Sequence, residues 1–305
     1  MREAKIITDQ LNFPEGPVAL ADGRYLAVEV LAGFLTEIDA EGNINRIAEL
    51  GGGPNGAAIG PDGRCYICNN GGITAEEIAL LRSDTPDETL NPGEPQGRIE
   101  VVDLASGEYR VLYDRCDGEQ LIAPNDLVFD QHGGFYFTDF GSLKVRQPQS
   151  SRVYYALADG SAIHSVATGL KRANGVGISP DEKTLYVSET NAGAVWAYAI
   201  AAPGKLIADQ ASRCGGHLLF QSDELEFDSL AVDSEGYVCV AALEHKSVAR
   251  IHPQTGGIHH VAVPGDGITN ICFGGENNQQ AYITASISGA LISMQWPCPG
   301  KKLSY

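Results

Sequence analysis

The sequence predicts an all-β fold, a six-bladed β-propeller whose four-stranded antiparallel blades surround a central channel. The first observation is a repeated sequence motif, in which a polar residue precedes an apolar run, a tight turn and a second apolar run. Its copies recur at spacings of roughly 40 to 70 residues, which fits a radial array of four-stranded units. The second observation is the content of 36 Gly and 15 Pro in 305 residues, because a meander of short strands needs frequent turns.

Five copies of the motif are clear and a sixth is weaker. In chain order they begin at Gly16, Pro54, Pro124, Ala173, Phe227 and Ile268. Hairpin turns between the first and second strands of a blade are predicted at Asp22-Gly23, Asp62-Gly63 and Glu235-Gly236, because such pairs suit tight turns. The start of each first strand and the end of each second strand should therefore share the opposite face of the ring.

Residues 1–305 are expected to form a single propeller domain, since one closed ring uses this length and no linker divides the sequence. A strand around Lys5 to Thr8 is expected to pair with the last strand, which ends near Trp296, and to complete the sixth blade. This pairing would remove an exposed sheet edge. The tail after Trp296 is expected to lie on the surface.

Residues 73–96 break the even spacing of the copies. They fall between the second and third strands of the second blade, so propeller topology directs them to the face that carries the channel mouth. Segments of this length inside a compact domain are usually either functional or disordered. We expect this insertion to form a lid or a wall over the mouth, with a subunit contact as the alternative.

The composition excludes several classes of protein. A net charge of −18 argues against binding to nucleic acid or to anionic membrane surfaces, because both favour basic patches. The sequence contains no run of about 18 apolar residues, so no transmembrane helix is expected. The first residues lack the apolar segment of a secretory signal, and a cytoplasmic protein is the default expectation.

The seven cysteines are odd in number and scattered, which suits a reducing compartment. Cys65 and Cys68 form a C-x-x-C pattern, but it lies inside a predicted strand, where positions three apart point to opposite faces. We interpret these cysteines as core thiols, in preference to a redox or zinc site.

The polar residues that head the copies are the candidate functional residues. Radial repetition should bring them to one point at the channel mouth; they are Glu15, Asn55, Asn125, Asn174, Asp228 and Asn270. The ends of the second strands should supply a further ring: Asn69, Asn70, Asp139, Glu189, Asn191, Glu244, His245 and Ser286. Buried carboxylates are normally paired or bound to metal, and oxygen ligands with a charge near −2 suit a hard divalent cation such as Ca²⁺.

The alternative is that each head residue caps a turn, because Asn and Asp side chains often bond to nearby backbone amides. Asn55 and Asn270 fit this reading best. Glu15, Asn174 and Asp228 fit it least, since Glu is a poor turn former and three such residues coincide.

At these positions the chain resembles the SMP-30/gluconolactonase/luciferin-regenerating-enzyme family of six-bladed propellers. The resemblance runs from about Phe13 to Ile283 and rests on the motifs NFPEGPV, APNDLVFD, RANGVGISPD and FDSLAVDSEGYVCVA. It implies one divalent metal ion at the channel mouth and hydrolysis of a small-molecule lactone. Ca²⁺ is the first choice for the ion, with Mg²⁺, Mn²⁺, Fe²⁺ or Zn²⁺ as alternatives.

By these motifs, the resemblance implies that Glu15, Asn174 and Asp228 are the core metal ligands, with Asn125 as a fourth ligand or a substrate-orienting amide. We expect Asp228 to be the general base, Asp126 to be the second choice and Asp139 to be a third candidate. Asp139 could instead hold a neighbouring ligand in place. Asn55, Asn125 and Asp139 are the expected substrate-binding residues.

The expected reaction is metal-dependent opening of a lactone by water, because a coordinated carbonyl is polarised and its oxyanion stabilised by the ion. The sequence has no G-x-S-x-G or H-E-x-x-H motif for a different hydrolase. Ala123 departs from family members that carry an Arg at this position, which favours a less polar lactone. The alternatives are a phosphotriester hydrolase and a non-catalytic calcium- or ligand-binding propeller with a structural ion.

Overall fold

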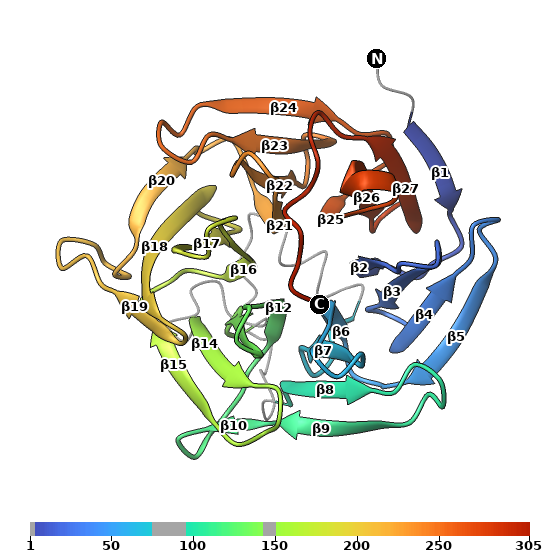
Figure 1. The fold of residues 1–305 in the computed structure, drawn as a ribbon, viewed down its shortest axis with the longest axis horizontal. Helices are drawn as coiled ribbons and strands as arrows, with labels where there is room; N and C mark the ends of the chain where they lie inside the picture. The colour runs from blue at the N-terminus through green and yellow to red at the C-terminus, as the bar shows by residue number, and fades with distance from the viewer. Residues whose placement is uncertain (1–3, 75–95, 143–150) are drawn as a thin grey trace.

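The computed structural model describes residues 4–74, 96–142 and 151–305, and six antiparallel sheets radiate from one axis (Figure 1). The first strand of each sheet lies nearest the axis, and these six strands contact one another around the ring. The predicted six-bladed propeller is therefore confirmed. No helix among the described residues is long and apolar enough to cross a membrane.

The first three blades follow chain order. Blade 1 consists of β2 (Pro14–Ala19), β3 (Tyr25–Glu29), β4 (Phe34–Ile38) and β5 (Ile44–Glu49). Blade 2 consists of β6 (Pro54–Ile59), β7 (Cys65–Asn69), β8 (Arg98–Val102) and β9 (Tyr109–Tyr113). A small hairpin of β10 (Arg115–Cys116) and β11 (Glu119–Gln120) leads to blade 3. Blade 3 consists of β12 (Pro124–Phe129), β13 (Gly134–Asp139), β14 (Arg152–Leu157) and β15 (Ile163–Ala167).

The remaining blades include one departure from four strands. Blade 4 consists of β16 (Ala173–Ile178), β17 (Thr184–Glu189), β18 (Ala194–Ala202), β19 (Lys205–Ile207) and β20 (His217–Gln221). Its long third strand, β18, pairs with both β19 and β20. Blade 5 consists of β21 (Phe227–Val232), β22 (Val238–Ala242), β23 (Ser247–Ile251) and β24 (Ile258–Ala262). Blade 6 begins with β25 (Ile268–Gly274), then the 3-10 helix η1 (Glu276–Asn278), β26 (Gln280–Ala285) and β27 (Ala290–Gln295).

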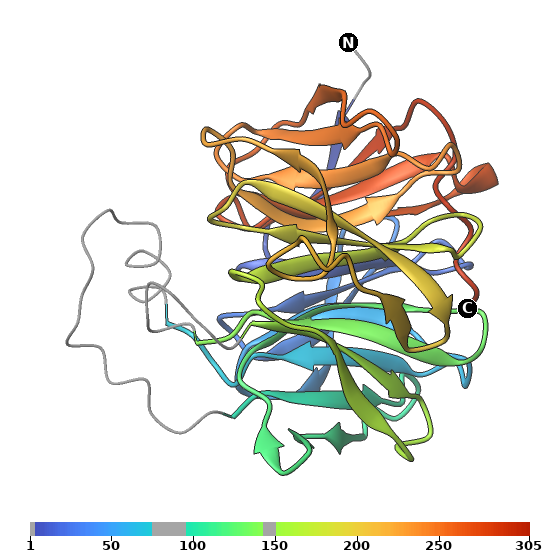
Figure 2. The same ribbon diagram turned by 90° about the vertical axis from the view of Figure 1, so that its left-hand side faces the viewer.

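The two ends of the chain meet in blade 6, as expected. Strand β1 (Ala4–Thr8) pairs antiparallel with β27 and becomes the outermost strand of that blade. The expectation of a surface tail holds only for its end, because Cys298 and Lys301 are buried whereas residues 302–305 are exposed. The Lys301 amide donates to the Val232 carbonyl at 2.9 Å, and its ammonium group pairs with Glu182 at 3.2 Å. The tail therefore crosses one face of the ring and ends near the axis (Figures 1 and 2).

The core is divided into six apolar clusters, each of which fills the space between two neighbouring blades. The C-x-x-C pair illustrates this division: Cys65 packs between blades 1 and 2, and Cys68 packs between blades 2 and 3. Burial raises the pKa of the Cys65 thiol to about 12. All seven cysteines are free, so these two are core thiols, as the strand alternation predicted.

Candidate functional site

One backbone hydrogen bond recurs in all six blades and defines one end of the channel. In each blade, the residue just after the second strand donates its N–H to the carbonyl of the residue just before the first strand, at 2.8 to 3.2 Å. The donor and acceptor pairs are Val30 and Phe13, Asn70 and Gly53, Phe140 and Ala123, Thr190 and Arg172, Leu243 and Glu226, and Ser286 and Gly267. This shared hydrogen bond aligns the six blades, so residues at the same distance along each first strand occupy equivalent positions.

Three levels follow one another down the channel. The rim consists of the six carbonyl acceptors just named: Phe13, Gly53, Ala123, Arg172, Glu226 and Gly267. The ring lies two residues further along each chain segment: Glu15, Asn55, Asn125, Asn174, Asp228 and Thr269. The inner layer comes next: Gly16, Gly56, Asp126, Gly175, Ser229 and Asn270. In the sixth blade the ring position is Thr269, so the prediction of Asn270 was wrong by one residue.

A cavity of about 120 Å³ opens at this end of the channel. Five ring residues line it: Glu15, Asn55, Asn125, Asn174 and Asp228. Four rim residues also line it, namely Phe13, Ala123, Arg172 and Glu226, together with Val30, Asn70, Ile73, Phe140, Thr190, Asn191 and Leu243. The fold thus brings together five of the six residues expected at the mouth, from five different blades.

A second axial cavity, of about 150 Å³, lies on the tail side of the channel. Most of its lining comes from apolar residues of the first strands and from the C-terminal tail, including Leu303 and Tyr305. Within the described part of the chain, Asp126 is the one acidic residue in that lining. The polar ring belongs to the other cavity, which is the candidate functional site.

Glu15 is the most buried acid of the ring, with 2% of its surface exposed. Its Oε2 atom accepts hydrogen bonds from the Asn270 amide at 3.1 Å and from the Gly16 N–H at 3.2 Å. Burial raises the pKa of Glu15 well above its ordinary value, and the negative charge of Asp228 raises it further. Hydrogen bonds from Thr269 and Asn270 lower it in part. Two carboxylates thus face one small space, an arrangement that a cation stabilises.

The amide residues of the ring offer oxygen atoms to the same space. Asn125 is buried, and within the described part of the chain its Oδ1 atom accepts no hydrogen bond. The Asn174 amide nitrogen donates to Thr190 at 3.0 Å, which orients the side chain. Among the described residues, its oxygen then has one long contact, to Ser229 at 3.4 Å. Buried acceptors without good donors are costly. The set of two carboxylates and two amide oxygens therefore fits a hard divalent cation.

Asp126 and Asp139 lie away from the mouth cavity. Asp126 is in the inner layer and faces the second axial cavity, and burial raises its pKa to about 7. The Asp139 carboxylate accepts the N–H groups of Ile122, Ala123 and Gly141 at 2.8 to 2.9 Å. Asp139 thus holds the backbone that leads to Asn125, which supports the alternative that it keeps a neighbouring ligand in place, and the described lining of the cavity does not include it.

The other residues predicted at the ends of the second strands divide between structural contacts, exposed positions and the cavity wall. The Glu189 carboxylate accepts hydrogen bonds from Trp196 and from the Lys171 N–H, and it pairs with Arg213. Glu244 and His245 are exposed. Asn70 and Asn191 do line the cavity.

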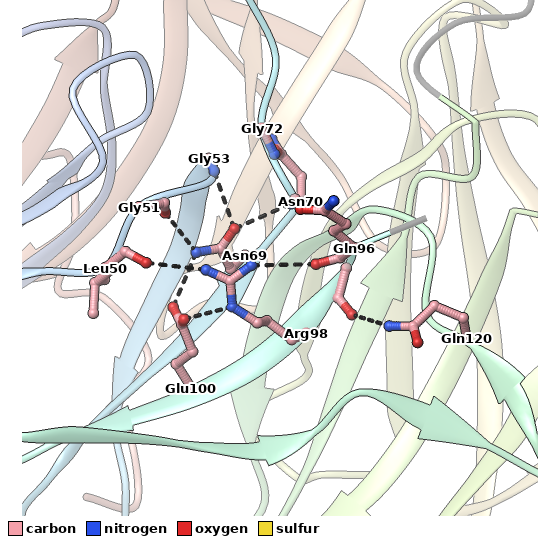
Figure 3. Close-up of polar contacts among 12 residues, drawn as sticks. Leu50, Gly51, Gly53, Asn69, Asn70, Gly72, Gln96, Arg98, Glu100 and Gln120 are labelled. Carbon is pink, nitrogen blue, oxygen red and sulfur yellow. Dashed lines mark hydrogen bonds and ion pairs between the residues drawn. The ribbon is translucent and has the colours of Figure 1, made fainter. Parts of the chain in front are cut away.

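The ends of the blade-2 insertion are fixed beside the mouth by a polar network (Figure 3). Asn69 accepts the N–H groups of Gly53 and Gly71, both at 3.0 Å, and donates to Glu100 at 3.0 Å. Arg98 pairs with Glu100 at 2.6 Å and donates to the Gln96 carbonyl at 3.3 Å. Residues 75–95, most of the predicted insertion 73–96, lie outside the described residues, but Ile73 lines the cavity.

The rim residues Arg172 and Glu226 were missed by sequence reasoning. Arg172 is 3% exposed, its backbone φ is 60°, and its guanidinium lies 5.2 Å from the Phe140 ring centre. Non-glycine residues seldom adopt such a φ, and residues strained in this way cluster at functional sites. Burial lowers the pKa of Arg172, while the charge of Glu226 opposes that effect. The available signal was position: each stands two residues before a predicted metal ligand.

Comparisons with known proteins agree with this architecture. The chain matches the model of the SMP-30/gluconolactonase/LRE-like region over residues 13–287. A gluconolactonase of Zymomonas mobilis is 23% identical over 316 residues, covering 92% of this chain and 78% of that protein. A lactonase drp35 of Staphylococcus saprophyticus is 29% identical over 212 residues, covering 70% of this chain and 57% of that protein. The structure of a calcium-binding protein, regucalcin, from Agrobacterium tumefaciens is similar with a TM-score of 0.75 at 16% identity, covering 99% of this chain and 98% of that one.

Proposed function

This chain belongs to the SMP-30/gluconolactonase/LRE-like family, and from this premise we propose that it is a metal-dependent lactone hydrolase. The relatives named as gluconolactonase and lactonase support the reaction class. The observation that carries the proposal for this chain is the convergence of Glu15, Asn125, Asn174 and Asp228 on one cavity at the channel mouth.

Glu15, Asn174 and Asp228 would hold the cation, and Asn125 would be a fourth ligand or would orient the substrate. Ca²⁺ is the ion that this all-oxygen set suits best, and the regucalcin relative is described as calcium-binding. Within the described residues no group of three or more His, Cys, Asp or Glu side chains comes together as a metal site. The proposed set differs from such groups because half of its donors are amide oxygens.

When bound, the cation supplies a Lewis acid that polarises the lactone carbonyl. The protein must also accept a proton from the attacking water. Asp228 is the preferred acceptor because it lines the mouth cavity, whereas Asp126 lies one level deeper and faces the other cavity. The apolar side chains of Phe13, Phe140 and Leu243 form part of the wall. With Ala123 at the blade-3 rim, this wall favours a less polar lactone over a polyhydroxylated one.

We expect the protein to hydrolyse at least one γ- or δ-lactone, to lose this activity on chelation and to regain it with one added divalent metal. The reason is that the polar ring offers a cation site, whereas no nucleophilic Ser or Cys lines the cavity among the residues that the structure describes. Proton release with a panel of sugar lactones, aliphatic lactones and phosphotriesters measures both substrate class and metal identity. Turnover that is unchanged after complete removal of metal would contradict the proposal.

A calcium-binding propeller without catalysis is the second candidate, and the similarity to regucalcin favours it. It predicts tight binding of Ca²⁺ with no hydrolysis of any lactone or phosphotriester under any metal. The same panel therefore separates the two candidates.

Protons and the cation are expected to compete for Glu15. Burial and Asp228 raise the pKa of Glu15 above its ordinary value of 4.5, so the metal-free carboxyl stays protonated over a wider range of pH. Cation binding must displace this proton, and affinity should rise with pH from 4.5 up to the raised pKa. Calorimetry of Ca²⁺ binding in two buffers of different ionisation enthalpy, from about pH 5 to about pH 9, measures both effects. Equal affinity throughout, without proton release, would contradict this expectation.

A further inference from the structure

A serine hydroxyl joins two of the proposed metal ligands across a blade boundary. Ser188 is fully buried in β17, one residue before the end of that strand. Its Oγ accepts the N–H of Gly175, next to Asn174, at 2.8 Å and donates to the carbonyl of Asp228 at 2.6 Å. One hydroxyl thus connects the backbone beside a blade-4 ligand to the backbone of a blade-5 ligand.

A threonine hydroxyl makes the equivalent connection one blade earlier. Thr138 is fully buried at the same position of β13. Its Oγ1 accepts the Asp126 N–H at 3.1 Å and donates to the carbonyl of Asn174. Asn174 is therefore held by Thr138 through its own carbonyl and by Ser188 through the following N–H.

Blade 6 connects to blade 1 with hydroxyls in a different arrangement. Ser286 donates to the carbonyl of Pro14, which precedes Glu15, at 2.6 Å. The Thr269 hydroxyl hydrogen-bonds to the Glu15 carboxylate and lies 3.0 Å from the hydroxyl of Thr284. Glu15, like Asn174 and Asp228, thus follows a blade whose second strand carries hydroxyl groups at this level.

The other three blade boundaries have no hydroxyl at this position. The residues one before the end of the second strand are Val28, Cys68 and Ala241, which precede the ring residues Asn55, Asn125 and Thr269. Hydroxyls therefore occur before the three ring residues that the sequence motifs single out as core ligands, and not before the others.

Each inner strand also leaves its regular pairing at the ring. The register of strand pairing shifts between Ala173 and Val176, and again between Phe227 and Leu230. Such a bulge takes its residues out of the regular ladder of hydrogen bonds and re-aims their side chains. A hydroxyl that bonds to the bulged backbone can fix the direction of a ligand that would otherwise have alternatives.

We propose that Thr138 and Ser188 are positioning residues that aim Asn174 and Asp228 at a divalent cation. This inference rests on the proposed function, because it requires that the ring binds a cation. On this proposal, two side chains that are not themselves metal ligands contribute a measurable part of the affinity for the cation. Residues that hold metal ligands in place typically have this effect.

The test is Ca²⁺ binding by the full chain, measured by calorimetry for wild type, Ser188→Ala, Thr138→Val and Thr138→Ser. We expect Ser188→Ala and Thr138→Val to weaken binding by about 10-fold, and Thr138→Ser, which keeps the hydroxyl, to stay within about twofold of wild type. Thr36→Val is the matched control, since Thr36 is fully buried but lies on β4, the third strand of blade 1, where its hydroxyl donates to the Glu29 side chain at 2.7 Å instead of to the backbone of a ring residue. It should leave Ca²⁺ affinity unchanged.

Thermal unfolding of each metal-free variant separates positioning from general stability. Similar losses of stability in Thr138→Val and Thr36→Val, with weaker Ca²⁺ binding only in Thr138→Val, would support the inference. Wild-type affinity in both Ser188→Ala and Thr138→Val, or equal weakening in Thr36→Val, would overturn it while leaving the proposed function intact. A wild-type chain that binds no divalent cation would instead overturn the metal-dependent function, and this inference with it.

Discussion

Replacement of Glu15 by Gln is expected to abolish cation binding at the channel mouth and to lower lactone turnover by ~100-fold or more. Gln has the same shape and can still accept the hydrogen bond of Asn270, so the change removes charge with little change in packing. A ring with one carboxylate no longer offsets the desolvation of a divalent ion. Burial already disfavours the Glu15 carboxylate, so the metal-free variant should be at least as stable as metal-free wild type.

Thermal unfolding with and without Ca²⁺ checks both parts of this prediction. Added Ca²⁺ should raise the unfolding temperature of wild type and leave that of Glu15→Gln unchanged, because a ligand stabilises only a state that it binds. Glu100→Gln is the matched control: Glu100 is also fully buried, but it pairs with Arg98 in the network of Figure 3. The control should lose stability and keep its response to Ca²⁺. A response to Ca²⁺ in Glu15→Gln would remove Glu15 from the ligand set.

The fold was predictable because a propeller repeats its signals. Each copy gave an apolar run, a turn with Asp-Gly or a similar pair, and a second run, and the closing strand β1 followed from the need to remove a sheet edge. The tail was not predictable in the same way. Its polar composition suggests surface, but Lys301 is buried against Glu182 of blade 4, a pairing between segments that no local pattern links.

The ring was predictable because it coincides with the head of each repeat. The error at the weakest copy shows the limit, since Thr269 and Asn270 are both polar and only the bulge in β25 decides which one takes the ring position. A shift of one residue reverses the direction of a side chain in a strand. The sequence alone does not contain the position of a bulge.

The acids at the ends of the second strands show a second limit. The sequence pattern predicts Asp139 and Glu189 as residues of the channel mouth. In the structure, their carboxylates accept backbone N–H groups from the segments that lead into the first strands of blades 3 and 4. Buried backbone donors must find partners, and this need outweighs exposure to the channel. The rim residues Arg172 and Glu226 also stand in segments that lead into first strands, and the paths of these segments cannot be read from the sequence.

Gly16→Ala is expected to destabilise the protein by about 4 kcal/mol and to remove cation binding as well. Gly16 follows Glu15 in the inner layer, and its φ of 50° is one that residues with a side chain rarely adopt. A Cβ atom here would overlap the Asn55 carbonyl and lie 2.7 Å from the Ala57 nitrogen. Both contacts are backbone atoms of the neighbouring blade, so no side chain can turn aside to make room. In the variant, blades 1 and 2 must therefore move apart next to the ring position that Glu15 occupies.

Gly63→Ala separates the two contributions to this effect. Gly63 also has a positive φ, of 74°, but a Cβ atom there meets nothing within 4 Å. This control should cost only the backbone strain, about 1 kcal/mol, and should bind Ca²⁺ as wild type does. Chemical denaturation and calorimetry of the two variants measure the difference. Equal stability and equal Ca²⁺ affinity of Gly16→Ala and Gly63→Ala would contradict this prediction. Glu15 would then be held in place by something other than the close approach of blades 1 and 2 at Gly16.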